Sequence, residues 1–172
     1  MEELLKQYFT ETGIGWAAIG AMMAVMFAGA GSARGIRIAA GQAAGVLSEK
    51  PQMFGKLLVL MALPGTQGFY GFIVAIFTAA RTGLLGGEVK VTPLMGVGLL
   101  AVGVCAGVVL WRSAVYQGEA SAAAINLTSR QPGESGRSIL MPALVETYAV
   151  VALLAAILFI MWITAMKVAP AA

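Results

Sequence analysis

Four long apolar segments dominate this 172-residue chain and set what it can fold into. They centre on residues 14–33, 57–80, 94–111 and 139–166. A helix needs about 20 apolar residues to cross a bilayer, and each segment is close to or above that length. Backbone polar groups cannot be hydrated in lipid, and the segments lack period-two alternation, so we expect four transmembrane helices. With 59% hydrophobic and 11% charged residues, the chain is no soluble globule, disordered tail or disulfide scaffold.

The two halves of the sequence look like copies of one unit. Pro64 and Tyr70 lie 78 residues before Pro142 and Tyr148, and the polar connections between neighbouring segments are short. We therefore predict an all-α membrane protein made of two duplicated hairpins, each of two antiparallel helices. Because each hairpin crosses the membrane twice, the two repeats have the same orientation in the membrane. The first hairpin takes residues 1–86, with spans of about 14–46 and 53–81. The second takes residues 87–172, with spans of about 93–128 and 136–168.

The distribution of cations predicts how the chain is oriented. Basic residues are enriched on cytoplasmic loops, so the two hairpin loops should lie in the cytoplasm and both termini on the opposite side. The hairpin-loop flanks hold seven of the eleven cations, which are Arg34, Arg37, Lys50, Lys56, Arg112, Arg130 and Arg137. The remaining four lie at the termini and in the central loop, and are Lys6, Arg81, Lys90 and Lys167.

Small residues are concentrated in the first and third spans. They allow helix backbones to approach closely in lipid, whereas the second and fourth spans carry bulkier side chains. This pattern is compatible with spans one and three forming the tight centre of a ring of copies, or with a compact four-helix bundle. The residues concerned are Gly20, Ala21, Ala24, Ala28, Gly29, Gly31, Ala33 and Gly35 in the first span, and Gly96, Gly98, Ala101, Gly103, Ala106 and Gly107 in the third.

Residue types that are absent exclude several kinds of chemistry. The chain has no His and no Asp, so it can hold neither a Ser-His-Asp triad nor a His-ligated metal site. The single Cys105 lies in an apolar run and cannot form an intrachain disulfide. The net charge of +3 is small and does not indicate binding to nucleic acid. We expect no catalytic activity from this chain alone and no organic cofactor.

Glu146 is the only acid deep inside an apolar segment. A charge at the bilayer centre costs about 2.5–3.5 kcal/mol on insertion scales, so such a residue is a functional candidate. Since we place no Lys or Arg at that depth, the carboxylate must be protonated or bind a cation. The alternative is a neutral Glu146 that makes a hydrogen bond between helices.

Polar groups in the second and third spans favour a cation. Pro64 lacks an N–H and kinks the second span, which leaves a backbone carbonyl without its donor. Thr66, Gln67 and Gln117 add side-chain oxygens, which hard cations prefer as ligands. These three residues could instead form interhelical hydrogen bonds. Tyr70 and Tyr148 are both candidates to hold the carboxylate, and Tyr70 is preferred because it lies one turn past the polar pair.

Together these features resemble the proteolipid of V-type and A-type rotary ATPases, called subunit K or c, over nearly the whole chain. The sodium-translocating branch is indicated by Leu63-Pro64-Gly65-Thr66-Gln67-Gly68, then Tyr70-Gly71, with Glu146-Thr147-Tyr148-Ala149. The resemblance implies Na⁺ ligands at Leu63, Thr66, Gln67, Gln117 and Glu146, with Tyr70 bonded to the carboxylate. The resemblance implies that the Leu63 backbone carbonyl is the ligand. Helix geometry differs on this point, because the missing N–H of Pro64 should free the carbonyl of Leu60.

The resemblance also implies partners and a location. Identical copies would form a rotor ring in lipid, turned by ATP hydrolysis in a separate soluble head. A central-stalk subunit would bind the cytoplasmic face, and a stator subunit would supply an arginine that helps eject the ion. We expect the plasma membrane of a prokaryote.

Three other functions remain open on the sequence. The same rotor could carry H⁺, with the polar residues holding a protonated Glu146. The chain could be a self-contained four-span channel or exchanger. A membrane enzyme is disfavoured by the short loops and by the lack of His and Asp.

Overall fold

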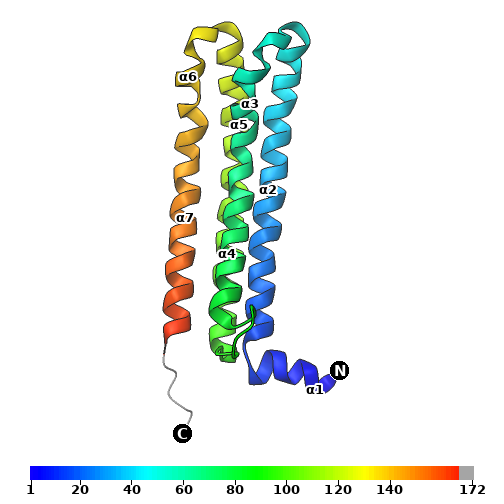
Figure 1. Cartoon of the computed structure of the whole chain (residues 1–172), viewed down its shortest axis with the longest axis vertical. Coiled ribbons are helices and arrows are strands. Elements are labelled where there is room, and N and C mark those ends of the chain that lie inside the picture. The colour runs from blue at the N-terminus through cyan, green and yellow to red at the C-terminus, as the bar shows by residue number, and fades with distance from the viewer. Residues whose placement is uncertain (167–172) are drawn as a thin grey trace.

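A computed structural model of the chain describes residues 1–166, and every regular element in that range is helical. Four long helical rods lie side by side and successive rods run antiparallel, with the two hairpin connections at one end and the N-terminus at the other (Figure 1). The elements are α1 (Glu2–Lys6), η1 (Gln7–Glu11), α2 (Ile14–Glu49), η2 (Pro51–Met53), α3 (Phe54–Ala62), η3 (Leu63–Gly65), α4 (Thr66–Thr82), α5 (Pro93–Arg130), η4 (Pro132–Glu134), α6 (Ser135–Ser138) and α7 (Leu140–Ala165).

All four rods are long and apolar enough to cross a membrane, as the sequence predicted. They span Ile14–Glu49, Pro51–Thr82, Pro93–Arg130 and Pro132–Ala165. The fourth predicted span ran to about residue 168, and its last two positions lie outside the described residues, as does Lys167. The chain is an integral membrane protein with two helical hairpins.

Several of the cations counted at the hairpin-loop flanks lie within the long helices, as the predicted spans of about 14–46 and 93–128 imply. Arg34 and Arg37 belong to α2, and Arg112 belongs to α5, because both helices continue well beyond their most apolar stretch. Hydropathy falls where a helix leaves the hydrocarbon, but nothing in the backbone requires the helix to end there. The orientation predicted from charge therefore depends most on the cations nearest the two hairpin connections, which are Lys50, Lys56, Arg130 and Arg137.

Prolines and a glycine mark several rod ends and the break within the second rod. Pro51, Pro93 and Pro132 begin rods two, three and four, at positions where a missing N–H costs nothing. Within the second rod, Pro64 sits in the short 3₁₀ turn η3 that separates α3 from α4. Gly83 ends α4 in the left-handed region (φ 86°), which a glycine adopts without strain.

The most extensive contact joins the parallel helices α2 and α5, which pack glycine against glycine. Three glycine pairs meet along it, at residues 13 and 96, 20 and 103, and 35 and 118, so the partners are always 83 residues apart. A Cβ on Gly20 would lie 2.6 Å from Leu100 Cα, closer than real Cβ atoms come to backbone. The predicted close packing of the first and third spans is therefore correct.

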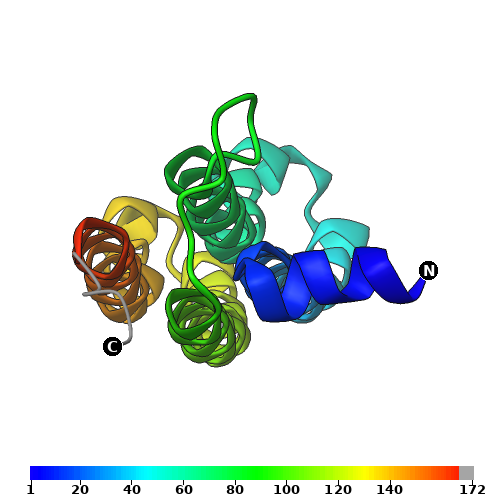
Figure 2. The same cartoon turned by 90° about the horizontal axis from the view of Figure 1, so that it is seen from below.

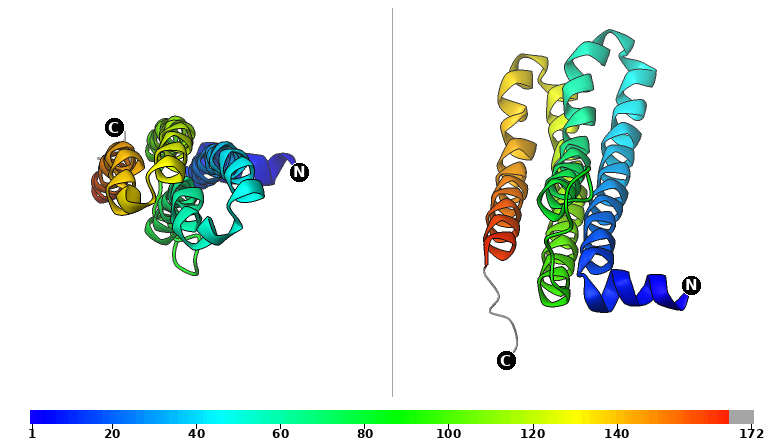
Figure 3. Two further views of the ribbon diagram at one scale, coloured as in Figure 1. Left: turned by 90° about the horizontal axis from the view of Figure 1, so that it is seen from above. Right: turned by 60° about the horizontal axis from the view of Figure 1, so that its bottom comes forward.

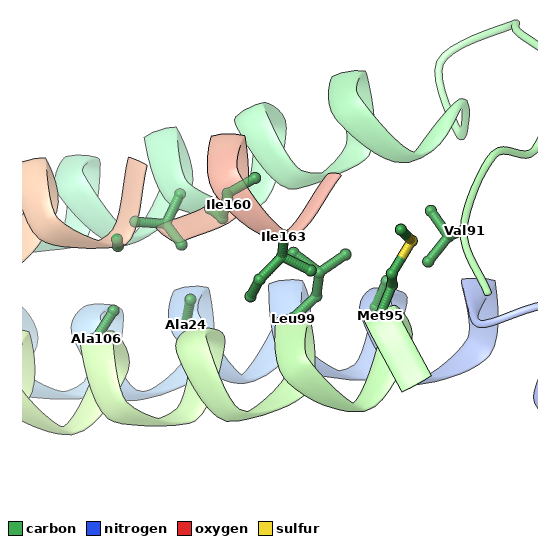
Figure 4. Close-up of a cluster of buried hydrophobic side chains, with 10 residues drawn as sticks. Ala24, Val91, Met95, Leu99, Ala106, Ile160 and Ile163 are labelled. Carbon is green, nitrogen blue, oxygen red and sulfur yellow. The ribbon is translucent and has the colours of Figure 1, made fainter. Parts of the chain in front are cut away.

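The other two long rods cover this pair. Helix α4 lies against both α2 and α5, whereas α7 lies against α5 and α4 and away from α2 (Figures 2 and 3). An apolar cluster joins all four rods near the end that carries the termini (Figure 4). It includes Ala24, Val91, Met95, Leu99, Ala106, Ile160 and Ile163. Helix α7 keeps many large apolar side chains exposed, which suits a lipid-facing element.

Replacing Gly20 by Ala should force α2 and α5 apart. Overpacking of this kind costs about 1–3 kcal/mol, which thermal unfolding in detergent should report as a lower midpoint. The matched control is Gly41→Ala on the same helix, where a Cβ meets nothing within 4 Å and helix propensity favours alanine by about 1 kcal/mol. Equal midpoints for the two variants would contradict a packing role for Gly20.

Candidate ion-binding site

The site is built around Glu146, which lies on α7 and is half-buried against two other helices. The Tyr70 hydroxyl, from α4, donates a hydrogen bond to Glu146 Oε1 at 2.7 Å. The Gln117 side-chain amide, from α5, donates to Glu146 Oε2 at 3.3 Å. Each carboxylate oxygen thus has its own donor, supplied by a different helix.

Two buried glutamines extend this arrangement into the bundle. Gln67 and Gln117 have no exposed surface, and Gln67 Nε2 donates to Gln117 Oε1 at 2.5 Å. Gln117 Nε2 also donates to the Pro142 carbonyl at 3.1 Å. Buried amides must find partners, and Gln117 satisfies both its own ends by joining α4 to α7.

The kink in the second rod supplies the remaining polar atoms. In the turn η3 the Leu63 carbonyl accepts a hydrogen bond from the Thr66 hydroxyl at 3.0 Å. The same hydroxyl lies 3.4 Å from Gln67 Oε1. Pro64 is buried in the turn, and it is the Leu63 carbonyl that the Thr66 side chain approaches.

A single hydrogen-bonded chain therefore connects six of the candidate residues that the sequence suggested. It runs from Leu63 and Thr66 through Gln67 and Gln117 to Glu146, and ends at the Tyr70 hydroxyl. Tyr148, the other tyrosine considered, does not join it and is 74% exposed. Pro64 contributes through the backbone turn rather than through a polar atom.

Three contacts around the site were not predicted from the sequence. The Ser113 hydroxyl, one turn before Gln117 on α5, donates to the Val145 carbonyl at 3.4 Å. The Ser32 hydroxyl on α2 accepts from the Gly68 amide at 2.8 Å. The Pro142 carbonyl is the third. The four-residue spacing of Ser113 and Gln117 could have indicated that both lie on one helix face. No sequence pattern indicates which backbone carbonyl a side chain will reach.

The electrostatics of the site centre on an acid without a basic partner. In residues 1–166 the two ion pairs join Lys6 to Glu2 and Arg137 to Glu134, and neither involves Glu146. An ionised carboxylate in such surroundings is compensated only by neutral donors. The arrangement can therefore take up a proton or a cation, and the nearby oxygens are of the kind that hard cations prefer.

The duplicated hairpins differ at this position. When Pro64 is aligned with Pro142, Gly68 takes the place of Glu146, so the first hairpin carries no carboxylate there. A Cβ on Gly68 would lie 3.3 Å from the Ser32 hydroxyl, which occupies the space beside it. One acid thus serves two hairpins.

Comparisons with known proteins agree with this architecture. The family model for the C subunit of ATP synthase matches residues 19–78 and 100–159, once in each half. V-type sodium ATPase subunit K of Enterococcus hirae is 31% identical over 149 residues, covering 87% of this chain and 92% of that protein. A-type ATP synthase subunit K of Methanocaldococcus jannaschii is 38% identical over 143 residues, covering 83% of this chain and 60% of that protein.

Substituting Gln117 by Ala should destabilise the protein strongly. It would leave Gln67 Nε2 without its acceptor and the Pro142 carbonyl without its side-chain donor, at about 1–3 kcal/mol for each buried group. Gln42→Ala is the control, because the hydrogen bond of the half-buried Gln42 to Asn126, at 2.6 Å between α2 and α5, is exposed. We expect a clear fall in the unfolding midpoint for the first variant only. Similar falls would contradict the bridging role of Gln117.

Proposed function

Since this chain belongs to the ATP synthase C-subunit family, the rotor proteolipids of rotary ATPases, we propose that each copy carries one Na⁺ ion across the membrane on Glu146. The chain itself is a non-catalytic, ion-translocating component. ATP would be hydrolysed in a separate soluble head that turns the rotor. The observation that carries the proposal is the hydrogen-bonded chain that links Glu146 to the kink at Leu63.

The donor set supports a cation as the cargo. One connected network contains four kinds of oxygen: the Leu63 carbonyl, the Thr66 hydroxyl, the Gln67 amide and the Glu146 carboxylate. Gln117 links the Gln67 side of this network to Glu146. Broken membrane helices commonly offer such backbone carbonyls to Na⁺. A proton would need only the acid and one partner. Tyr70 then holds the carboxylate in place by its hydrogen bond.

Desolvation would couple ion binding to rotation. An empty, ionised Glu146 resists moving against lipid, whereas a bound Na⁺ cancels its charge. A difference of about 2 kcal/mol between the two states corresponds to about thirtyfold in population. Rotation past lipid would therefore select the loaded chain, and no separate gate is needed within it.

The proposed cycle needs partners outside this chain. Identical copies form the rotor ring, with each two-hairpin chain contributing one carboxylate. A stator subunit would admit the ion through a half-channel and release it with the help of an arginine that competes for Glu146. A central-stalk subunit would grip the hairpin loops, which we place in the cytoplasm of a prokaryote, with both termini outside the plasma membrane.

The near alternative is the same rotor carrying H⁺. Its support is that Tyr70 and Gln117 already bond both carboxylate oxygens, so a protonated Glu146 would have partners at hand. Sodium is favoured because the oxygens of Leu63, Thr66 and Gln67 take no part in the two hydrogen bonds to Glu146. They would therefore add nothing to holding a proton on the carboxylate, whereas a cation could use them as ligands.

Na⁺ should protect Glu146 from a carboxylate-reactive carbodiimide at fixed pH, because the bound ion displaces the proton that the reagent needs. Mass spectrometry of the purified oligomer reports labelling at this residue. Gln67→Ala should raise the half-protecting Na⁺ concentration about tenfold, equivalent to about 1.4 kcal/mol, whereas Gln42→Ala should not. Labelling that Na⁺ does not slow in the unaltered protein would favour H⁺ as the cargo.

A further inference from the structure

Helix α4 begins at the break in the second rod, and its N-cap residue is Gly65, which has no side chain to cap with. The turn η3 before it contains Pro64. The first N–H groups of a helix have no acceptor within that helix, so each needs a partner from elsewhere. Gly68, the third residue of α4, carries one of these donors.

The Ser32 side chain of α2 supplies the cap that Gly65 cannot. Its hydroxyl accepts a hydrogen bond from the Gly68 N–H at 2.8 Å, and Ser32 is 6% exposed. An N-cap serine commonly makes this bond to the third residue of its own helix. Here the same bond joins two helices, so α2 fixes where the first turn of α4 lies.

Close packing on both sides of this bond fits the two helices together. Helix α2 lies along the second rod (Figure 1), and a Cβ on Gly35 would lie 2.7 Å from Pro64 Cβ. A Cβ on Gly71 would come closer still to Ala28 Cβ. Ala28, Ser32 and Gly35 recur at helical spacing, so they form one face of α2. Ser32 is the polar residue in the middle of that face.

The candidate ligands of the second rod come from the residues just before Gly68. They are the Leu63 carbonyl, the Thr66 hydroxyl and the Gln67 amide oxygen. The hydrogen bond of Ser32 goes to Gly68, the residue that follows them. Ser32 therefore acts on the ligands through the position of the backbone that carries them.

Without this hydroxyl, the Gly68 N–H would need another acceptor. A continuous α-helix would supply the carbonyl four residues earlier, which belongs to Pro64. Forming that bond would wind η3 towards α-helical geometry, whereas the structure has a 3₁₀ turn there. Because this turn holds the Leu63 carbonyl and the Thr66 hydroxyl together, winding it would change the spacing of the ligands.

We propose that Ser32 is a positioning residue for the ion site, which holds the broken second rod in the geometry that binds Na⁺. This inference rests on the proposed function. A ligand set that is already in place costs less to order when the ion binds. Loss of the Ser32 hydroxyl should therefore weaken Na⁺ binding. It should not change how Glu146 holds a proton, because that carboxyl group is bonded by Tyr70 and Gln117.

Carbodiimide labelling of Glu146 in the purified oligomer separates these two effects. Ser32→Ala should raise the Na⁺ concentration that half-protects Glu146 about fivefold, the equilibrium effect of one typical hydrogen bond. Labelling of the same variant without Na⁺, at the same pH, should keep the rate of the unaltered protein. Removal of a residue that merely supported the fold would change labelling under both conditions.

Two further variants control for lost packing. Thr78→Ala removes a buried hydroxyl from α4, where it bonds the Val74 carbonyl of the same helix at 2.8 Å, and it should leave protection by Na⁺ unchanged. Ser32→Cys fills the space of the hydroxyl with a weaker acceptor, so it should weaken Na⁺ binding even if the alanine variant fails to assemble. Native mass spectrometry reports whether each variant forms the oligomer.

The outcomes separate this inference from the function on which it rests. Weaker protection by Na⁺ with unchanged Na⁺-free labelling, in an intact oligomer, supports the positioning role. Unchanged protection in the Ser32 variants, or equal weakening by Thr78→Ala, overturns it and leaves Na⁺ as the cargo. Loss of the oligomer in both Ser32 variants, or altered labelling without Na⁺, makes Ser32 a structural residue and also overturns it. Labelling that Na⁺ does not slow in the unaltered protein overturns the Na⁺ function as well.

Discussion

The protein depends on one electrostatic constraint, which is a carboxylate on a membrane helix with no basic residue bonded to it in the part of the chain that the structure describes. Neutral donors from Tyr70 and Gln117 can orient Glu146 but cannot cancel its charge. In the proposed function, the remaining compensation comes from a captured ion. Because that ion would leave the site neutral, the interaction proposed to stabilise the loaded site would also permit it to move through lipid.

The fold serves this site through two local features of the sequence. Glycine pairs bring α2 and α5 close together, and the second and fourth rods then pack around them with their bulkier side chains. Pro64 interrupts the second rod at the level of the site, so the Leu63 carbonyl meets the polar chain that ends at Glu146. The two buried glutamines connect these features, because Gln117 on α5 bonds groups on both α4 and α7.

Most of the architecture could be predicted from the sequence, because hydropathy and small-residue spacing act over short stretches of chain. The four spans, the two hairpins and the α2–α5 contact follow from such patterns, and the structure brings Glu146, Tyr70 and the two glutamines together as the motifs suggested. Helices α2 and α5 continue past their most apolar stretch, so Arg34, Arg37 and Arg112 lie in helices, as the predicted spans of about 14–46 and 93–128 imply. The Pro142 carbonyl and the Ser32 hydroxyl join the network only through tertiary packing, which leaves no mark in the sequence.

The central claim is that a captured monovalent ion neutralises Glu146. Its most direct test is equilibrium Na⁺ binding to the purified oligomer across a range of pH, comparing the unaltered protein with Glu146→Gln. The account predicts saturable binding of one Na⁺ per chain, weakened by protons at low pH and abolished by the substitution. Binding that persists in Glu146→Gln, or no Na⁺ binding at any pH, would contradict it.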